Sequence, residues 1–244
     1  MHRFFVDPGS ISHRAVRFDD DQAHQMRRVL RLRRGDAVLV LDGRGWQYEV
    51  MLDEVSHARV TGQVGERTEA TGEPAVRLSL FQSLLRREKF EWVLQKGTEL
   101  GVARFMPVIT RRSLVRDIED VTPEKLNRWR RIIKEAAEQS GRGLLPELAP
   151  PLPYAAAVNE ARATGHAIIA WEGVTHMNIR DALQAGATNI ALFIGPEGGF
   201  DPDEITEAVD AGCVAVTLGR RILRTETAAI VGTTLILHEL GELG

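Results

Sequence analysis

Two loops near the C-terminus, each following a short apolar run, constrain the fold of this chain more than any other feature. The glycine loop (residues 194–200) follows the apolar run 189–193, and the arginine loop (residues 218–228) follows the run 214–217. Each combines a short strand, a loop and a helix, and in open α/β sheets ligands bind just beyond the carboxyl ends of the strands. The two loops therefore predict one shared pocket.

The glycine loop predicts a close approach between main chain and ligand. Its three glycines allow backbone angles closed to other residues and let a ligand approach the backbone. Asp201 is expected to cap the following helix, with Pro202 at the first helical position and Glu204 completing a capping box. The glycine spacing matches neither a dinucleotide fingerprint nor a P-loop. Because Glu197 repels phosphate, a ligand with a cationic centre fits better, and a tight turn without a ligand is the alternative.

The arginine loop contains three arginines beside Thr225, Glu226 and Thr227, followed by a predicted helix that runs to about His238. Thr225 is expected to be the N-cap of this helix, and Glu226 suits the positive end of the helix dipole. The alternative is a capped helix with solvated arginines. Two such loops in one chain favour a functional site.

Composition limits the class of protein. The chain has 244 residues, enough for one large or two modest domains. Cys213 is the only cysteine, which excludes an internal disulfide and fits a reducing compartment. The seven histidines show no metal-ligand spacing, so no metal site is expected. No apolar stretch has membrane-spanning length and the N-terminus lacks a signal-peptide pattern, so we expect a cytoplasmic protein without membrane contact.

The charge is unevenly distributed along the chain. Net charge is zero over residues 1–72, +5 over residues 73–144 and −8 over residues 145–244, which together give −3. The middle third therefore offers a candidate phosphate-facing surface, although the total charge does not indicate a nucleic-acid-binding protein.

Residues 1–72 contain several short strand patterns at close spacing, with one predicted helix at residues 20–30, which is typical of a small β-barrel. Residues 65–74 are polar and punctuated by Gly and Pro, so we place the domain boundary there and predict domains 1–72 and 73–244. The second domain alternates strand and helix patterns, which favours a parallel α/β sheet. Val76, Leu78 and Leu80 are expected to alternate along its first strand, and Trp92 and Trp129 are expected to pack in its core.

Several motifs in this order resemble one known family. They are Ile-Gly-Pro-Glu-Gly-Gly (194–199), Leu-Arg-Thr-Glu-Thr-Ala (223–228), residues 89–102, Glu-Gln-Ser-Gly-Arg (138–142), His-Arg-Phe-Phe (2–5) and residues 24–31. Together they resemble the bacterial 16S rRNA (uracil(1498)-N(3))-methyltransferase family of the SPOUT superfamily. Arg220 departs from the pattern, because a proline is expected after Leu218-Gly219.

This resemblance implies the fold, the cofactor and the partners. The fold class is α/β, with an N-terminal PUA-like β-barrel that binds RNA and a SPOUT domain with a C-terminal trefoil knot. The cofactor is S-adenosyl-L-methionine, and the substrate is a uridine of 16S rRNA within the 30S subunit. The family forms a homodimer with each pocket near the interface.

The resemblance also implies site residues. The cofactor-binding set comprises the glycine loop, most of the arginine loop and a third stretch: Ala170, Trp171, Glu172, Ile194, Gly195, Pro196, Glu197, Gly198, Gly199, Leu218, Gly219, Ile222, Leu223, Thr225, Thr227 and Ala228. The expected RNA-binding residues are mostly basic: His24, Arg27, Arg28, Arg31, Lys96, Arg111, Arg112 and Arg142. Solvated basic residues, and a helix-surface ion pair between Lys96 and Glu99, are the alternatives.

Four residues are expected to take part in catalysis. Methylation at N3 requires loss of the N3 proton and an unpaired or flipped base. Arg224 is expected to stabilise the uracil anion, and Glu226 or Glu197 to accept the proton or balance the sulfonium. Arg142 is expected to complete the site from the same or the partner subunit. Two other functions stay open: a SPOUT methyltransferase acting on another RNA, and a non-catalytic RNA-binding ribosome assembly factor.

Overall fold

The computed structural model describes residues 1–244 except 13, 87 and 116. The chain divides into two compact units, residues 1–73 with 137–145 and residues 74–136 with 146–244. The first unit therefore includes a segment that the predicted boundary assigned to the second domain. The reason is packing, because Ala137 is buried against Phe5 and Leu41, and the Phe5 amide donates to Glu138 Oε1 at 2.8 Å.

The first unit is built on one six-stranded sheet. Its strands are β1 (Arg3–Phe5), β2 (Ile11–Ser12), β3 (Ala15–Arg17), β4 (Ala37–Leu41), β5 (Trp46–Val55) and β6 (Val60–Glu69), in the order β1-β4-β5-β6-β3-β2. β1 pairs with β4 in parallel, and the other pairings are antiparallel. Phe4, Met26, Val38, Val50 and Val60 fill the core of this unit.

The helical segment of the first unit begins at α1 (Asp20–His24) and continues as a π-helical stretch, η2 (Gln25–Val29). Asp19 caps α1, and Gln22 completes its capping box. The chain leaves this segment through Arg31, which is the only described non-glycine residue with positive φ, at 55°. A short 3₁₀ turn, η1 (Pro8–Ser10), precedes β2.

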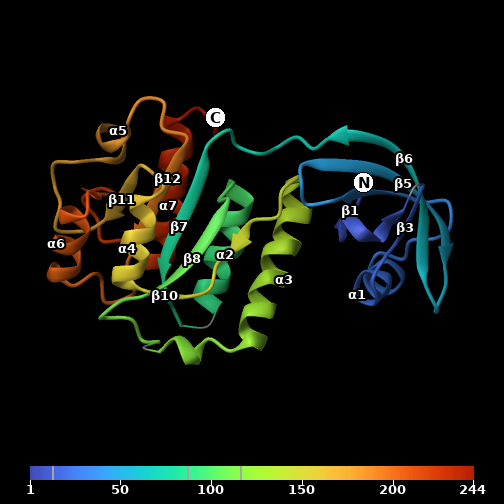
Figure 1. The fold of residues 1–244 in the computed structure, drawn as a ribbon, viewed down its shortest axis with the longest axis horizontal. Coiled ribbons are helices and arrows are strands. Elements are labelled where there is room, and N and C mark those ends of the chain that lie inside the picture. The colour runs from blue at the N-terminus through green and yellow to red at the C-terminus, as the bar shows by residue number, and fades with distance from the viewer. Residues whose placement is uncertain (13, 87, 116) are drawn as a thin grey trace. The chain divides into compact units, whose positions relative to one another are not determined.

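The second unit is a parallel sheet with helices on both faces (Figure 1). Its strands are β7 (Arg77–Ser83), β8 (Arg104–Ile109), β9 (Glu147–Leu148), β10 (Leu152–Pro153), β11 (Ala167–Ala170), β12 (Asn189–Ile194) and β13 (Val214–Val216). The order is β10-β8-β7-β12-β11-β13, with β9 beside β8, and all pairings are parallel. β12 lies between β7 and β11, so strand order does not follow chain order.

The helices of the second unit cover the two faces unequally. One core gathers side chains from α2 (Glu88–Leu100), α3 (Pro123–Ser140), α5 (Ile179–Ala182) and α7 (Thr225–Glu239). The opposite core gathers side chains from α4 (Tyr154–Arg162) and α6 (Pro202–Asp210). A 3₁₀ turn, η3 (Ile118–Asp120), precedes α3. The sheet is thus covered on both sides, which leaves the strand ends as the accessible edges.

Two expectations about packing are wrong. β7 does not alternate, because every residue from Leu78 to Ser83 is buried. A strand in the middle of a doubly covered parallel sheet is buried on both faces, which removes the two-residue period. Trp129 is buried, as expected, but Trp92 is 42% exposed, because the buried face of α2 is formed by Phe90, Val93 and Leu94.

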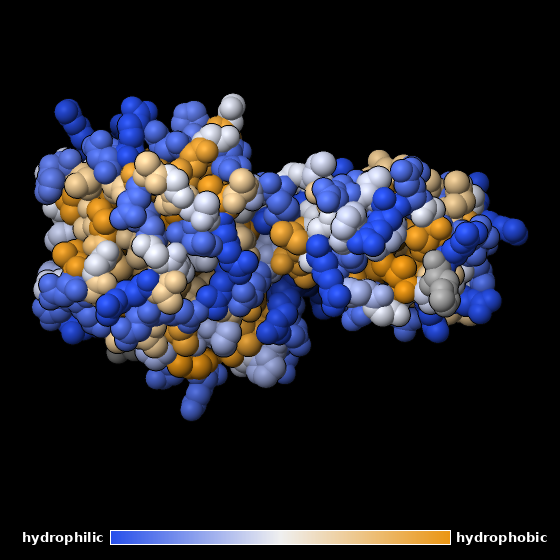
Figure 2. Space-filling model, turned by 45° about the horizontal axis from the view of Figure 1, so that its top comes forward, coloured by the Kyte–Doolittle hydropathy of each residue, from blue (hydrophilic) through white to orange (hydrophobic). Residues whose placement is uncertain are grey.

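Apolar residues also reach the surface. On the face shown in Figure 2, hydrophobic atoms lie in separate groups between hydrophilic ones. None of the described helices combines the length and the apolar character that crossing a bilayer requires.

Candidate functional site

The glycine and arginine loops line a common cavity at the carboxyl ends of β11, β12 and β13. The cavity has a volume of about 610 Å³, which is typical of a small-molecule site. Its described lining residues are Lys89, Ala170, Glu172, Ile194, Gly195, Pro196, Glu197, Gly198, Gly199, Phe200, Ile222, Leu223, Arg224, Thr225 and Ala228. An adjoining cavity of about 120 Å³ shares five of them and adds Trp171, Thr217, Leu218, Gly219, Arg220 and Arg221.

These cavities bring together the predicted cofactor-binding residues with one exception. Thr227 is not among the described lining residues, and its side chain is exposed. Phe200, Thr217, Arg220 and Arg221 line the cavities although the predicted set does not contain them. They lie next to predicted residues in the chain, so extending the set along each loop would have included them.

The glycine loop depends on its glycines for two different reasons. Gly199 has a φ of +69°, and a Cβ at this position would lie 2.8 Å from Glu172 Oε1. Gly195 has no positive φ, but a Cβ there would lie 3.1 Å from the ring of Phe200. The left-handed backbone and the crowding both exclude larger side chains. The main chain of this loop is therefore open to the cavity.

The helix that follows the glycine loop is capped as predicted. Asp201 and Glu204 form the capping box of α6, and Pro202 is the first helical residue. Glu204 is buried, and its second carboxylate oxygen accepts a hydrogen bond from the amide of Arg111 at 2.8 Å. This contact ties the start of α6 to the segment that follows β8.

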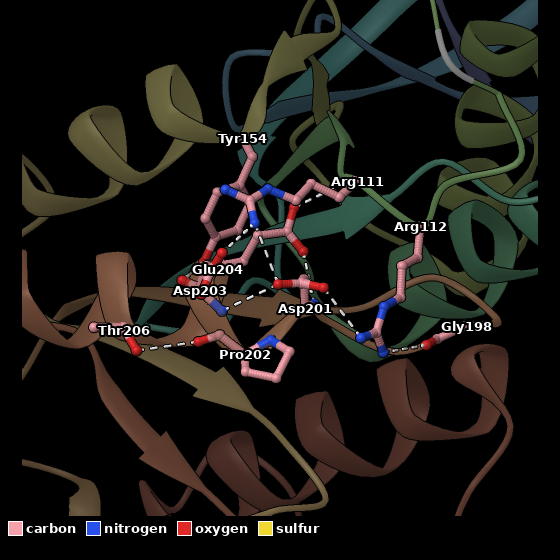
Figure 3. A network of polar contacts seen from close by, with 9 residues as sticks. All are labelled: Arg111, Arg112, Tyr154, Gly198, Asp201, Pro202, Asp203, Glu204 and Thr206. Atoms are coloured by element: carbon pink, nitrogen blue, oxygen red, sulfur yellow. Dashed lines mark hydrogen bonds and ion pairs between the residues drawn. The ribbon is translucent and has the colours of Figure 1, made fainter.

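Arg111 and Arg112, which are expected to bind RNA, lie beside the start of α6, and Arg112 also contacts the glycine loop (Figure 3). Arg112 donates to the Gly198 carbonyl at 3.2 Å and to Asp201 Oδ2 at 3.1 Å. Arg111 donates to Asp203 Oδ2 at 2.7 Å, and this bond raises the pKa of Arg111. Arg112 thus holds the glycine loop and Arg111 holds the start of α6, and their contact with RNA stays a prediction.

Thr225 joins the two loops, and its predicted capping role is wrong. Helix α7 begins at Thr225, with Arg224 in the N-cap position and no side-chain cap. The buried Thr225 hydroxyl donates to the carbonyl of Gly195 and accepts a hydrogen bond from Gln82 Nε2 at 3.2 Å. The hydroxyl therefore serves a contact 30 residues away in the chain, which a local capping rule does not detect.

Lys89 is a site residue that the sequence analysis missed. It lies in the first turn of α2, lines the larger cavity, and places Nζ 3.4 Å from Glu197 Oε1 and 3.8 Å from Glu226 Oε2. Glu226 Oε2 is buried and has no hydrogen-bond donor among the described residues. The available signal was the position of Lys89 at the start of the helix that follows the first predicted strand of the domain, at the same sheet edge as the two loops.

The remaining catalytic candidates differ in their surroundings. Arg224 is exposed and lines the larger cavity. Arg142 lies in the first unit, with its side chain 4% exposed and its guanidinium bonded to Glu73 at 2.6 Å and 3.2 Å. Its ion pair gives it a structural role there, and its catalytic role stays a prediction.

The other expected RNA-binding residues lie in and just after the helical segment of the first unit, with Lys96 on α2. His24, Arg28 and Arg31 are exposed on the first unit, and Arg27 donates to the Ala23 carbonyl at 3.0 Å. Lys96 forms the surface ion pair with Glu99 that was the alternative to RNA contact, at 2.8 Å, and its contact with RNA stays a prediction. Among the described residues, no group of three or more His, Cys, Asp or Glu could hold a metal ion.

Comparison with known proteins places this fold and site in a class. The RNA methyltransferase domain family matches residues 72–237, which include every residue of both cavities. The fold and site are therefore those of an RNA methyltransferase.

Individual relatives narrow the class. Ribosomal RNA small subunit methyltransferase E of Synechocystis sp. is 35% identical over 96% of this chain and 77% of its own length, and that of Bacillus subtilis is 30% identical over 90% and 88%. The structure resembles that of the Neisseria gonorrhoeae enzyme bound to S-adenosyl methionine, with a TM-score of 0.88 and 29% identity over 98% and 97% of the two chains. The chain belongs to the ribosomal RNA small subunit methyltransferase E family.

Proposed function

We propose that this protein transfers a methyl group from S-adenosylmethionine to N3 of one uridine, of the 1498 type, in 16S rRNA of the 30S subunit. The observation that carries the proposal is the cavity of about 610 Å³ that the glycine and arginine loops form together. The relatives named for small-subunit rRNA methylation and the Neisseria structure bound to S-adenosyl methionine support the substrate and the cofactor.

The residues present fit this cofactor. Its sulfonium and amino groups are cationic, and two carboxylates, Glu172 and Glu197, line the larger cavity. Gly195 and Gly199 line the larger cavity and carry no side chain, so the main chain there is accessible to an adenosyl group. When bound, S-adenosylmethionine supplies an electrophilic methyl carbon with a neutral thioether as leaving group.

The side chains of the cavity provide the remaining chemistry. Glu197 or Glu226 accepts the N3 proton of the uracil, and Arg224 stabilises the anion at O2 or O4. Arg142 completes the site from the same or the partner subunit. The loops hold donor and acceptor in line, and such orientation supplies a large share of the rate enhancement.

The finer features of the proposal follow the family resemblance. The first unit is a PUA-like barrel that binds rRNA through His24, Arg27, Arg28 and Arg31, with Lys96 contributing from the second unit. The C-terminal segment is threaded as a trefoil knot, the protein works as a homodimer, and it acts in the cytoplasm. Base flipping exposes the Watson–Crick edge of the target uridine.

One experiment tests the proposal. Unmodified 30S particles are incubated with the protein and labelled S-adenosylmethionine, and the rRNA is digested and analysed by mass spectrometry. A single N3-methyluridine near the decoding centre is the expected product. Label on another nucleotide would keep the assignment as a SPOUT methyltransferase but change its target nucleotide. Absence of label, together with absence of cofactor binding by calorimetry, would favour a non-catalytic RNA-binding assembly factor.

A further inference from the structure

We infer that Lys89 is a further catalytic residue of this site, whose ammonium group binds a carbonyl oxygen of the target uracil and stabilises its N3 anion. This inference rests on the proposed function. It assigns a role to a residue outside both the glycine loop and the arginine loop.

The first step is the position of Lys89. It reaches the larger cavity from the start of α2, after the carboxyl end of β7, while Glu197 and Glu226 reach it from the segments after β12 and β13. Three segments distant in the chain therefore bring one cation and two carboxylates together. Such a cluster in a small-molecule cavity is typical of a site that moves a proton.

The second step is the unused capacity of the ammonium group. A lysine has three N–H donors, and among the described residues Lys89 Nζ makes one long hydrogen bond, 3.4 Å to Glu197. The distance to Glu226 Oε2, 3.8 Å, exceeds hydrogen-bond length. The side chain is 39% exposed, so donors are available to a ligand in the cavity. The two carboxylates orient the ammonium without saturating it.

The third step is the chemistry of the uracil edge. N3–H is a donor flanked by the acceptors O2 and O4, so it matches an acceptor and a donor placed side by side, as Glu197 or Glu226 and Lys89 are. The N3–H bond breaks and its proton goes to one of these carboxylates. The N3 lone pair then bonds to the methyl carbon, and the carbon–sulfur bond breaks with both electrons remaining on sulfur. Lys89 stabilises the negative charge that O2 and O4 share with N3.

Cytosine gives the opposite match at the same edge. Its N3 is an acceptor, so the carboxylate would face an acceptor, and an ammonium placed beside position 4 would face the donor amine. Polar groups of the site that lose their water and gain no hydrogen-bond partner disfavour binding of such a base strongly. The Lys89 cluster therefore favours uracil over cytosine.

The test compares Lys89→Met and Lys89→Arg with wild-type protein, with Lys134→Met as the control for loss of a lysine outside the cavity. Cofactor binding is measured by calorimetry with S-adenosylmethionine, and kcat by methyl transfer to unmodified 30S particles. Lys89→Met is expected to lower kcat about 10²-fold. Its cofactor Kd should be unchanged or smaller, because the lost positive charge no longer opposes a cationic ligand. Lys89→Arg keeps the charge and should retain part of kcat.

A substrate variant tests the anion directly. 30S particles reconstituted with 5-fluorouridine-containing 16S rRNA present a more acidic N3–H, so the kcat penalty of Lys89→Met should shrink. The inference would be overturned if Lys89→Met lost cofactor affinity and kcat equally and its kcat penalty were the same on 5-fluorouridine-containing particles. Lys89 would then be a residue that positions the loops. The inference would also be overturned if the wild type formed N3-methyluridine and Lys89→Met had the same kcat. A wild type that forms no N3-methyluridine overturns the proposed function, and the inference falls with it.

Discussion

The hydroxyl of Thr225 donates a hydrogen bond to the carbonyl of Gly195, and this bond joins the arginine loop to the glycine loop. The same hydroxyl accepts from Gln82 Nε2 at the end of β7. One buried side chain therefore connects the segments after β12 and β13 with the central strand of the sheet. The shape of the cavity depends on that connection, because both loops line it.

Replacing Thr225 with valine keeps its shape and removes the hydroxyl. Gly195 O and Gln82 Nε2 then lose a buried partner, which costs about 1–3 kcal/mol of unfolding free energy. Urea denaturation should show this loss, and calorimetry should show weaker S-adenosylmethionine binding. Thr225→Ser keeps the hydroxyl and should stay close to wild type in both measurements. If Thr225→Val bound S-adenosylmethionine as tightly as wild type, the hydrogen bond from Thr225 to Gly195 would not determine the shape of the cavity.

Arg112 positions the glycine loop from outside the cavity. Its guanidinium holds both the Gly198 carbonyl and Asp201, and Figure 3 shows it between the glycine loop and the N-cap of α6. Arg112→Met removes both bonds while keeping much of the side-chain length. Because the contacts are exposed, stability should change by less than about 1 kcal/mol.

The effect of Arg112→Met should therefore lie in binding. We expect S-adenosylmethionine affinity to fall several-fold in calorimetry, with the melting temperature nearly unchanged. Arg111→Met removes the contacts to Asp203 and Asp201 but none to the loop carbonyl, so it serves as the matched comparison and should affect the cofactor less. Equal effects of the two variants would count against a specific role for the Gly198 bond.

How much of this site the sequence predicts depends on whether a contact is local. Asp201, Pro202 and Glu204 lie within four residues, and their capping box forms as predicted, because capping uses only neighbouring backbone groups. The two loops were located for a similar reason, since each directly follows a short strand. Hydrophobic runs and turn residues predict structure well where the contacts join residues that are close in the chain.

Contacts through space are beyond this kind of prediction. The hydroxyl of Thr225 bonds a carbonyl 30 residues away, and Lys89 meets Glu197 across 108 residues of chain. Lys89 meets Glu197 because β12 lies next to β7, and Thr225 meets Gly195 because α7 packs against β12; chain order reveals neither neighbour. Trp92 was misplaced for a related reason, because helical spacing cannot decide which apolar side chain faces the sheet.

Gly199 offers a test of the glycine loop with a close control. Gly199→Ala places a Cβ on a left-handed backbone and 2.8 Å from Glu172 Oε1, so the loop or Glu172 must move. Gly212→Ala imposes a similar left-handed strain, with φ of +96°, but its Cβ meets no atom within 4 Å. Both variants should lose about 1–2 kcal/mol of stability from backbone strain.

Only Gly199→Ala should also lose cofactor affinity. Glu172 lines the larger cavity, so its displacement removes a carboxylate from the cationic ligand. Calorimetry with S-adenosylmethionine separates the two variants, since Gly212 is outside both cavities in the part of the chain described. Comparable affinity loss in Gly212→Ala would show that general destabilisation, and not the loop, controls binding.

Glu73 makes the stability of the first unit depend on pH. Burial alone raises the pKa of Glu73, but hydrogen bonds from Arg142 and from the amides of Leu144 and Gly143 outweigh burial and hold it below the ordinary value of 4.5. A carboxylate with a depressed folded-state pKa contributes stability above its unfolded-state pKa and loses it as pH falls through the folded-state value. Wild-type stability should therefore decline below about pH 4.5.

Glu73→Gln isolates this contribution. Glutamine cannot neutralise the buried guanidinium of Arg142, so at pH 7 the variant should lose about 3 kcal/mol, the range for breaking a buried ion pair. The difference in unfolding free energy between wild type and variant should shrink from pH 5 towards pH 3, because protonation removes the charge from the wild type as well. Urea denaturation across this range measures it. A difference that stays constant with pH would show that the charge of Glu73 does not stabilise the unit, and that its hydrogen-bond geometry alone matters.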